Sequence, residues 1–423
     1  MWERFSYYGM RALLVLYMVK YLLLGPMDHV IGFAETRAAL EYLFGPLEVQ
    51  PLASQIYGFY TAFVYLTPIF GGWLADRVLG LRRTVVLGGV LMSAGHFMMA
   101  FESMFLLALL TLIVANGCFK PNISTQVGGL YPAGDPRRDR AFPIFYVGIN
   151  LGAFFAPLVC GTLGEELGWH WGFAAAGVGM LCGLAIYLRG ARHLPPDERP
   201  RAAAGPRPRL SRSDWRAVIA LTLLLVPTLL SWAAYEQQGN TIALWAEYST
   251  DRSLGPLAIP TTWFQSFNPF MIFAFTPFVV ALWARQARGG SEPSTVAKLG
   301  LGYAGIAVSY LIMAAAAWHS GGDKASWLWL LAFFVVLTVG ELYSSPIGLS
   351  LVTKLAPASI LSTMMGLWLG AGFLGNFLAG WLGSFWSAMD KAEFFLMIAG
   401  VGAASAASTW ALAPFVGRSL RER

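Results

Sequence analysis

Twelve long apolar runs constrain the fold of this chain more than any other feature. They lie at about 5–24, 52–75, 84–101, 104–127, 141–163, 171–190, 215–246, 263–284, 297–318, 325–350, 359–385 and 392–414. A helix needs about 20 apolar residues to cross the hydrocarbon core of a bilayer. Only 12% of the 423 residues are charged, whereas a soluble domain has about 25%. The sequence therefore predicts an all-α integral membrane protein with twelve transmembrane helices.

The basic residues indicate how these helices are oriented. If the amino terminus is cytoplasmic, most of the 29 lysine and arginine residues fall in cytoplasmic loops or at the carboxyl end. The opposite side then carries only Lys20, Arg37, Arg252, Lys324 and Lys391. Because cytoplasmic loops are enriched in Lys and Arg, we predict a multi-pass protein with both termini in the cytoplasm. The net charge of +6 is thus explained by topology, and no nucleic-acid partner is expected.

The segment 191–214 divides the chain into two halves of six apolar runs each. It reads ARHLPPDERPRAAAGPRPRLSRSD, is rich in Arg and Pro, and lacks helical periodicity. A solvated tether is predicted, with an amphipathic helix on anionic lipid as the alternative. The predicted domains are a six-helix bundle over 1–190, a cytoplasmic linker over 191–214 and a second six-helix bundle over 215–423.

The first apolar run contains charges that lipid would not tolerate. Glu3, Arg4 and Arg11 lie within it or at its mouth, and each charge near the bilayer centre costs about 2.5–3.5 kcal/mol. On a helix, Arg4, Tyr8 and Arg11 share one face, with Glu3 and Tyr7 along its flank. We therefore expect a polar stripe that faces inward, toward partners or a water-filled cavity.

Later runs add one lysine and two glutamates. Lys120 lies well inside the fourth run, where it either snorkels to the interface or faces inward; its apolar neighbours favour the inward position. In the seventh run, Trp232, Glu236 and Asn240 have helical spacing, and Glu341 lies in the tenth. Cations in one half and carboxylates in the other predict a site for a small zwitterion between the halves, with the carboxylates carrying protons.

The stretch GGWLADRVLGLRRT, residues 71–84, follows the second run. It resembles the loop motif of the major facilitator superfamily. The resemblance implies that Asp76, Arg77, Arg82 and Arg83 latch the cytoplasmic ends of neighbouring helices and so act in gating.

Several motifs together resemble the proton-dependent oligopeptide transporter (POT) family of that superfamily. ERFSYYG at 3–9 is similar to the family signature Glu-x-x-Glu-Arg-Phe-x-Tyr-Tyr-Gly, and FYVGINLGAF at 145–154 is similar to its Phe-Tyr-x-x-Ile-Asn-x-Gly motif. Further matches are GCFKP, YEQQG, QSFNP and ELYSSPIGLS, in the fourth, seventh, eighth and tenth runs. The resemblance covers essentially the whole chain. It implies the major facilitator fold and proton-coupled import of dipeptides and tripeptides by alternating access.

The resemblance also assigns roles to residues. The proton-coupling set would be Glu3, Arg4, Lys120, Glu236 and Glu341. The peptide carboxylate would be held by Arg11 and Lys120 with help from Tyr8, and the peptide amino group by Glu341. The full implied substrate-binding set is Tyr7, Tyr8, Arg11, Tyr65, Lys120, Asn150, Trp232, Asn268, Glu341 and Trp368.

This chain departs from the family pattern in three places. The first glutamate of the signature would precede Met1, so we expect the sequence to begin inside a truncated helix. The short 191–214 linker lacks the two extra helices of many bacterial members, and the short connection from His319 to Ser326 lacks the large insertion of animal members. The second absence favours a bacterial inner-membrane protein. The expected partners are dipeptides and tripeptides, protons and the lipid bilayer, and the protein is expected to be a monomer.

Three other functions are alternatives. Plant relatives of this family carry nitrate, so an anion carrier is one alternative, and a peptide sensor that does not transport is another. A membrane hydrolase has little support, because the five histidines show no metal-ligand or Ser-His-acid spacing. We therefore expect no enzyme activity, no metal and no prosthetic cofactor, with protons as the coupling ion.

Overall fold

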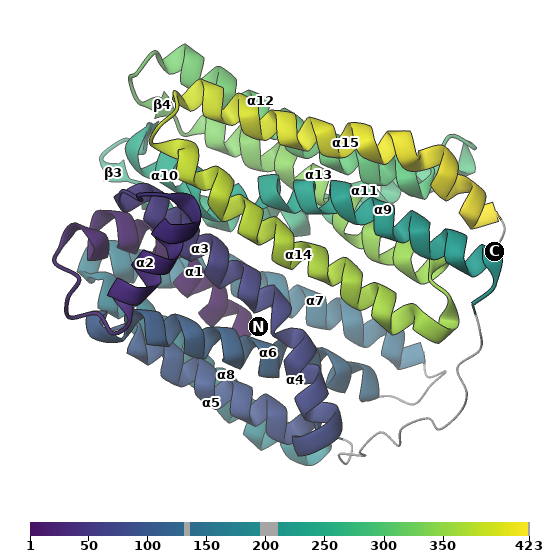
Figure 1. The fold of residues 1–423 in the computed structure, drawn as a ribbon, viewed down its shortest axis with the longest axis horizontal. Coiled ribbons are helices and arrows are strands. Elements are labelled where there is room, and N and C mark those ends of the chain that lie inside the picture. Colours follow the sequence, from purple (N-terminus) through teal and green to yellow (C-terminus); the bar gives the residue numbers. More distant parts are fainter. Residues whose placement is uncertain (131–135, 195–209, 422–423) are drawn as a thin grey trace. The chain divides into compact units, whose positions relative to one another are not determined.

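The computed structural model describes residues 1–130, 136–194 and 210–421, and helices dominate this part of the chain (Figure 1). Ten of the described helical segments are long and apolar enough to cross a membrane. The predicted all-α membrane fold is confirmed, but the count of twelve spans is not reproduced. The helices of the runs at 52–75 and 84–101 are not among these ten. Thr67 divides the first run, and the helix of the second run begins at Leu81 and so includes Arg82 and Arg83 as well as His96.

Contacts along the chain define two compact units. Unit 1 comprises Met1–Ala202, Gly239–Glu247 and Arg252–Phe270. Unit 2 comprises Ala203–Gln238, Tyr248–Asp251 and Met271–Arg423. The predicted domains are continuous stretches of the chain, whereas each unit combines several segments, and the predicted division stays a prediction. Residues 195–209 of the predicted linker lie outside the described residues.

Unit 1 contains most of the helices of the first half of the chain. In order they are α1 (Trp2–Lys20), η1 (Leu22–Leu24), α2 (Phe33–Phe44), α3 (Val49–Leu66), α4 (Pro68–Leu74), η2 (Ala75–Leu79), α5 (Leu81–Met98), η3 (Glu102–Met104), α6 (Phe105–Gly129), α7 (Pro136–Ala156), η4 (Pro157–Gly161), η5 (Leu163–Leu167), α8 (Trp169–Gly190) and η6 (Ala191–His193). Later segments add most of α10 (Thr241–Tyr248), the hairpin of β2 (Ser253–Leu254) and β3 (Leu257–Ala258), and η8 (Thr261–Ser266).

Small residues bring the helices of unit 1 close together. Helix α1 packs against α7 and α8, while α5 packs against α6 and α8 (Figure 1). A Cβ atom added to Gly71 on α4 would lie 1.9 Å from the carbonyl oxygen of Gly117 on α6. Only glycine permits this approach, as is common where helices cross in membranes.

The carboxyl-terminal part of the α7 span is π-helical. Pro157 lacks a backbone N–H and begins η4, and a second π-helical turn, η5, follows after Thr162. The wider turns rotate the following side chains relative to a regular α-helix. Glu165 and Glu166 lie in this π-helical region.

Unit 2 contains most of the later helices. They are α9 (Arg212–Tyr235), η7 (Glu236–Gly239), α11 (Phe267–Arg288), α12 (Thr295–Ser320), α13 (Leu328–Leu355), η9 (Ala358–Ile360), α14 (Leu361–Gly383), η10 (Ser384–Trp386) and α15 (Lys391–Arg421). Gly239 of η7 and the first residues of α11 belong to unit 1. Strand β1 (Thr250–Asp251) pairs in parallel with β4 (Ala325–Ser326).

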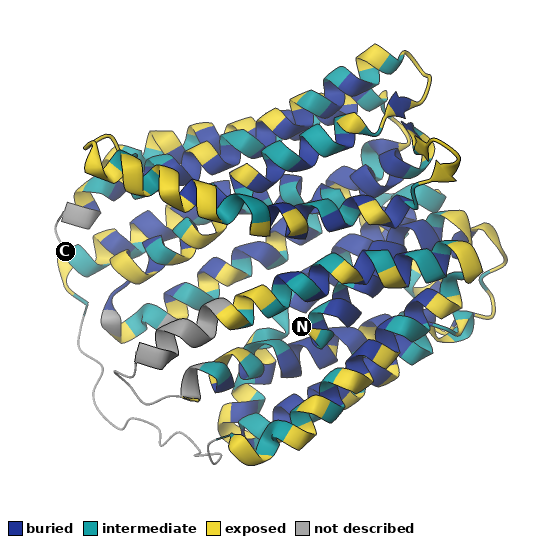
Figure 2. Cartoon of the chain, turned by 180° about the vertical axis from the view of Figure 1, so that it is seen from behind, coloured by how far each residue is buried: buried dark blue, intermediate teal, exposed yellow. Residues whose placement is uncertain are grey.

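Helix α9 begins at Arg212, earlier than the predicted run at 215. Ser211 is its N-cap and forms a reciprocal capping box with Asp214, which satisfies two backbone N–H groups at the helix start. Within unit 2, α12 packs against α13 and α15, and α9 packs against α14 and α15. Figure 2 shows buried residues on the sides of helices that meet neighbouring helices, and exposed residues on the outer sides.

Candidate functional site

Helix α1 carries a buried polar stripe. Glu3, Tyr7 and Arg11 are between 5% and 8% exposed, and Arg4 is half-buried. The Nε atom of Arg4 lies 3.3 Å from Oε2 of Glu3. The rings of Tyr7 and Tyr8 meet edge to face with their centres 5.2 Å apart. The pairing of opposite charges reduces the desolvation cost of burying them in a membrane protein.

Arg11 is held by a tyrosine on α3. Its Nε–H donates to the Tyr57 hydroxyl over 2.7 Å, and Tyr57 is completely buried. Sequence reasoning did not select Tyr57 for the site. The sequence does contain one signal for it, a tyrosine within an apolar run. A buried Tyr hydroxyl usually has a hydrogen-bond partner, so such a tyrosine indicates a polar contact inside the protein.

Lys120 and Tyr65 are brought together from α6 and α3. The Lys120 Nζ atom lies 4.4 Å from the centre of the Tyr65 ring. This cation–π contact favours the inward position of Lys120 over snorkelling, since the ammonium has an aromatic partner within unit 1.

Two asparagines of the predicted set are also buried in unit 1. Asn150 on α7 is 6% exposed, and its side-chain amide donates to the carbonyl oxygen of Tyr146 over 3.0 Å. Asn268, near the start of α11, is 7% exposed. Their contacts to a substrate stay a prediction.

The remaining residues of the predicted binding and proton-coupling sets belong to unit 2. Glu236 is 1% exposed at the start of η7, and the Trp232 ring meets Tyr235 edge to face at 5.7 Å. Glu341 on α13 is half-buried. Trp368 on α14 is 6% exposed and lies against Gly348, where an added Cβ would come within 2.7 Å of the indole.

The expected helical face of Trp232, Glu236 and Asn240 is not maintained. The α-helix ends at Tyr235, and the 3₁₀ turn η7 changes the repeat before α10 begins. Trp232 and Glu236 belong to unit 2, whereas Asn240 belongs to unit 1, where its side-chain oxygen accepts a hydrogen bond from Ser54 over 2.9 Å. The prediction failed because it assumed one continuous α-helix.

The predicted gating residues surround the turn between α4 and α5. Asp76, Arg77 and Arg83 are exposed, whereas Arg82 is half-buried and its guanidinium donates to the carbonyl oxygen of Leu194. This bond connects the start of α5 to the segment that follows α8. Participation of these residues in gating stays a prediction.

A second polar cluster in unit 1 was missed by sequence reasoning. The Glu165 carboxylate accepts hydrogen bonds from the backbone N–H groups of Thr261 and Thr262, each over 2.8 Å, and from the Thr262 hydroxyl over 2.7 Å. It therefore caps η8, because the first N–H groups of a helix have no partner within it. Gly161 makes room, since an added Cβ there would lie 1.9 Å from the Thr262 hydroxyl oxygen.

Ion pairs extend this cluster. Arg252 lies 3.7 Å from Glu165 and 3.4 Å from Glu247, and Lys20 pairs with Glu247. These charges lie at the ends of apolar runs, where the sequence alone marks them only as interface residues. A cavity of about 330 Å³ is lined by Lys20, Glu165, Arg252 and neighbouring residues.

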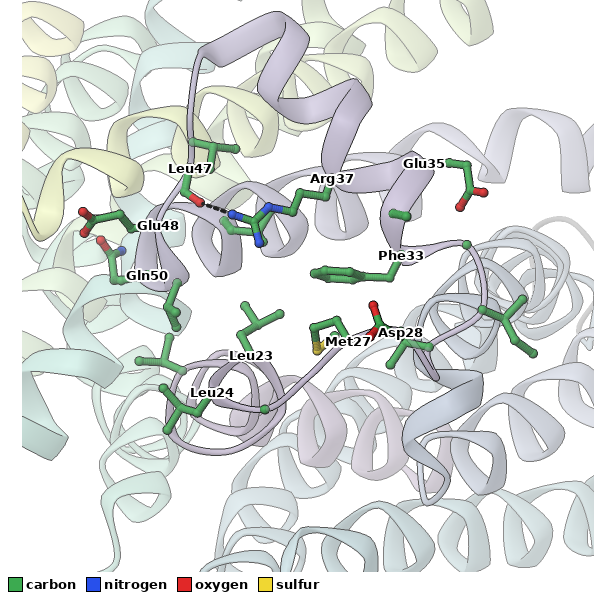
Figure 3. A pocket seen from close by; sticks show the side chains of 18 residues that line it. Leu23, Leu24, Met27, Asp28, Phe33, Glu35, Arg37, Leu47, Glu48 and Gln50 are labelled. Atoms are coloured by element: carbon green, nitrogen blue, oxygen red, sulfur yellow. Dashed lines mark hydrogen bonds between the residues drawn. The ribbon is translucent and has the colours of Figure 1, made fainter.

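A larger cavity of about 1010 Å³ lies among η1, the 25–32 segment, α2 and the start of α3 (Figure 3). Leu23, Phe33 and Leu47 are among its apolar lining residues. On one wall, Arg37 donates to Glu41 over 2.9 Å and to the carbonyl oxygen of Leu47 over 3.3 Å. None of the predicted site residues lines this cavity. Across the described ranges, no group of three or more His, Cys, Asp and Glu residues is placed to hold a metal ion.

Long apolar helices with paired, buried charges define a multi-pass α-helical membrane protein. A family model described as POT family matches residues 82–204 and 209–401. A di-/tripeptide transporter of Lactococcus lactis subsp. cremoris is 33% identical over 95% of this chain and 90% of its own length. The peptide transporter YePEPT of Yersinia enterocolitica subsp. palearctica is 33% identical over 90% of this chain and 85% of its own length.

Solved structures of POT transporters are also similar to this chain. A crystal structure of a peptide transporter POT in complex with sulfate has a TM-score of 0.87 and 30% identity, covering 99% of this chain and 93% of its own. A POT family transporter in complex with 5-aminolevulinic acid has a TM-score of 0.79 and 26% identity, covering 98% and 94%. The chain belongs to the POT family of transporters.

Proposed function

We propose that this protein imports dipeptides and tripeptides together with protons by alternating access. The observation that carries the proposal is the buried Arg11 guanidinium, which is hydrogen-bonded to the neutral Tyr57 hydroxyl. The Tyr57 hydroxyl is a neutral partner, and arginine–carboxylate pairs are strong and directional, which suits Arg11 to a peptide carboxylate. Relatives at 33% identity are named di-/tripeptide transporters, which supports peptides as the substrate.

Lys120 is proposed as the second cation for the peptide carboxylate. Its ammonium lies 4.4 Å from the centre of the Tyr65 ring, in the same unit as Arg11. Glu341 is proposed to bind the peptide amino group. The other proposed substrate-binding residues are Tyr7, Tyr8, Tyr65, Asn150, Asn268, Trp232 and Trp368.

Proton coupling is proposed to arise from competition for the same cations. When Glu3 loses its proton on the cytoplasmic side, it pairs with Arg4 or Lys120, and this pairing releases the peptide carboxylate. The Glu3–Arg4 pair at 3.3 Å supports this step. Glu236 and Glu341 are the other proposed proton carriers. The membrane potential contributes about 2.3 kcal/mol per charge per 100 mV.

The proposal includes the surroundings of the protein. We place it as a monomer in the inner membrane of a bacterium, with both termini in the cytoplasm. The proposed gating residues are Asp76, Arg77, Arg82 and Arg83. Protons are the coupling ion, and the peptide crosses the membrane without a chemical change.

The test is uptake of labelled dialanine into proteoliposomes with and without an inward pH gradient. Accumulation above equilibrium that a protonophore abolishes is the expected result. Counterflow without a gradient separates a carrier from a sensor, because a sensor binds the peptide and shows no counterflow. Uptake of nitrate in place of dialanine would overturn the proposal in favour of an anion carrier.

A further inference from the structure

Gly239 lies against the contact between Arg11 and Tyr57. It ends η7, just before α10, and is the last residue of the YEQQG motif. A Cβ atom added to Gly239 would lie 2.1 Å from the Tyr57 hydroxyl oxygen and 3.1 Å from Nη2 of Arg11. Real Cβ atoms essentially never come as close to another atom as 2.1 Å, so any side chain here would displace the hydroxyl.

The displaced groups have little space into which they could move. Tyr57 is 0% exposed and Arg11 is 7% exposed. One residue further along, Asn240 accepts the hydrogen bond from Ser54 on the same helix as Tyr57, and both are completely buried. This second contact holds α3 against the chain at residue 240. The Tyr57 hydroxyl is therefore enclosed between Arg11 and the backbone at Gly239.

We propose that Gly239 is a positioning residue for the peptide carboxylate site. Its lack of a side chain lets the Tyr57 hydroxyl accept the Arg11 Nε–H, and this bond sets the plane of the guanidinium. The two Nη groups of Arg11 carry its other four N–H donors, so the orientation of this plane decides how well they meet a carboxylate. The inference rests on the proposed role of Arg11 in binding the peptide carboxylate.

The test measures binding of dialanine and of dialanine amide to wild-type protein, G239A, Y57F and the double variant. Alanine is a suitable probe, because Gly239 is not among the glycines with positive φ and its backbone accepts any residue. We expect G239A and Y57F each to bind dialanine about ten-fold more weakly. Binding of the amide, which lacks the carboxylate, should be unchanged.

The double variant tests the contact itself. Y57F removes the hydroxyl that a Cβ at position 239 would meet, so adding G239A to Y57F should have little further effect. If G239A alone does not fold, Y57F and the double variant still make the comparison without the clashing oxygen. Folding of the double variant where G239A fails would support the same contact.

Two controls separate the possible failures. Gly400 on α15 has no atom within 4 Å of an added Cβ, so G400A should behave as wild type. R11Q tests the proposed function: unchanged preference for dialanine over its amide would remove Arg11 from the carboxylate site. The role of Gly239 is overturned, and that of Arg11 stands, if R11Q loses this preference while G239A keeps it. The same conclusion follows if G239A weakens binding of dialanine and of dialanine amide equally. Additive losses in the double variant would also overturn it.

Discussion

The Lys120 ammonium lies 4.4 Å from the centre of the Tyr65 ring. A contact of this kind contributes about 0.5–1 kcal/mol at exposed sites and about 2 kcal/mol or more when desolvated. Both residues of this contact belong to unit 1.

Replacement of Lys120 by Ala should abolish proton-driven accumulation of dialanine, because the variant lacks the cation for which Glu3 and the peptide are proposed to compete. The protein should stay folded in detergent, since the truncated side chain is half-buried. Uptake in proteoliposomes with an inward pH gradient is the measurement. K324A changes an exposed lysine in the connection between α12 and β4 and is the matched control. Undiminished uphill transport by K120A would exclude the charge-competition mechanism.

Replacement of Glu341 by Gln should weaken binding of peptides with a free amino group at least about ten-fold, because a charge-assisted hydrogen bond is lost. Amino-blocked peptides should bind nearly as they do to the wild type. Competition against labelled dialanine, with and without an acetylated amino terminus, provides the comparison. Equal losses for both peptides would remove Glu341 from its proposed role.

Replacement of Glu165 by Gln should lower the thermal stability of the protein in detergent. The carboxylate uses both oxygens to accept from Thr261 and Thr262, and an amide has only one oxygen. A buried N–H left without an acceptor costs about 1–3 kcal/mol. E166Q changes the exposed neighbouring residue and should unfold at the wild-type temperature. Equal midpoints for the two variants would show that capping of η8 by Glu165 contributes nothing.

The protection of α2 against hydrogen exchange should depend on pH. Hydrogen bonds from the Arg37 side chain and from the Leu47 backbone N–H lower the pKa of the Glu41 carboxyl from its ordinary value of 4.5. A lowered pKa in the folded state means that the carboxylate stabilises the structure above the unfolded pKa. This stabilisation is lost as the pH falls through the folded pKa.

Hydrogen exchange of residues 33–44, corrected for the intrinsic pH dependence, should therefore accelerate as the solution is acidified below the ordinary pKa of Glu41. E41Q should remove this pH dependence, whereas E35Q on the same helix should retain it. An identical response in wild type and E41Q would contradict the assignment to Glu41.

Much of the fold was predictable because its signals are local. The length and apolarity of a run decide whether a helix can span a bilayer, and ten described segments meet that condition. The short motifs from ERFSYYG onward identified the POT family, which the family match confirms. Local patterns failed where a helix changes type. The 3₁₀ turn after Tyr235 and the π-helical turns after Pro157 both alter the repeat on which spacing arguments depend.

The site itself depends on contacts between distant parts of the chain. Residue spacing placed Glu3, Tyr7, Tyr8 and Arg11 on one helix, and charge in an apolar run was enough to predict that they face inward. The position of the Tyr57 hydroxyl between Arg11 and Gly239, and the capping of Thr261 by Glu165, followed only from how the helices cross. Periodicity describes one helix at a time, whereas these contacts depend on the distances between helices, which small residues such as Gly161 and Gly239 determine.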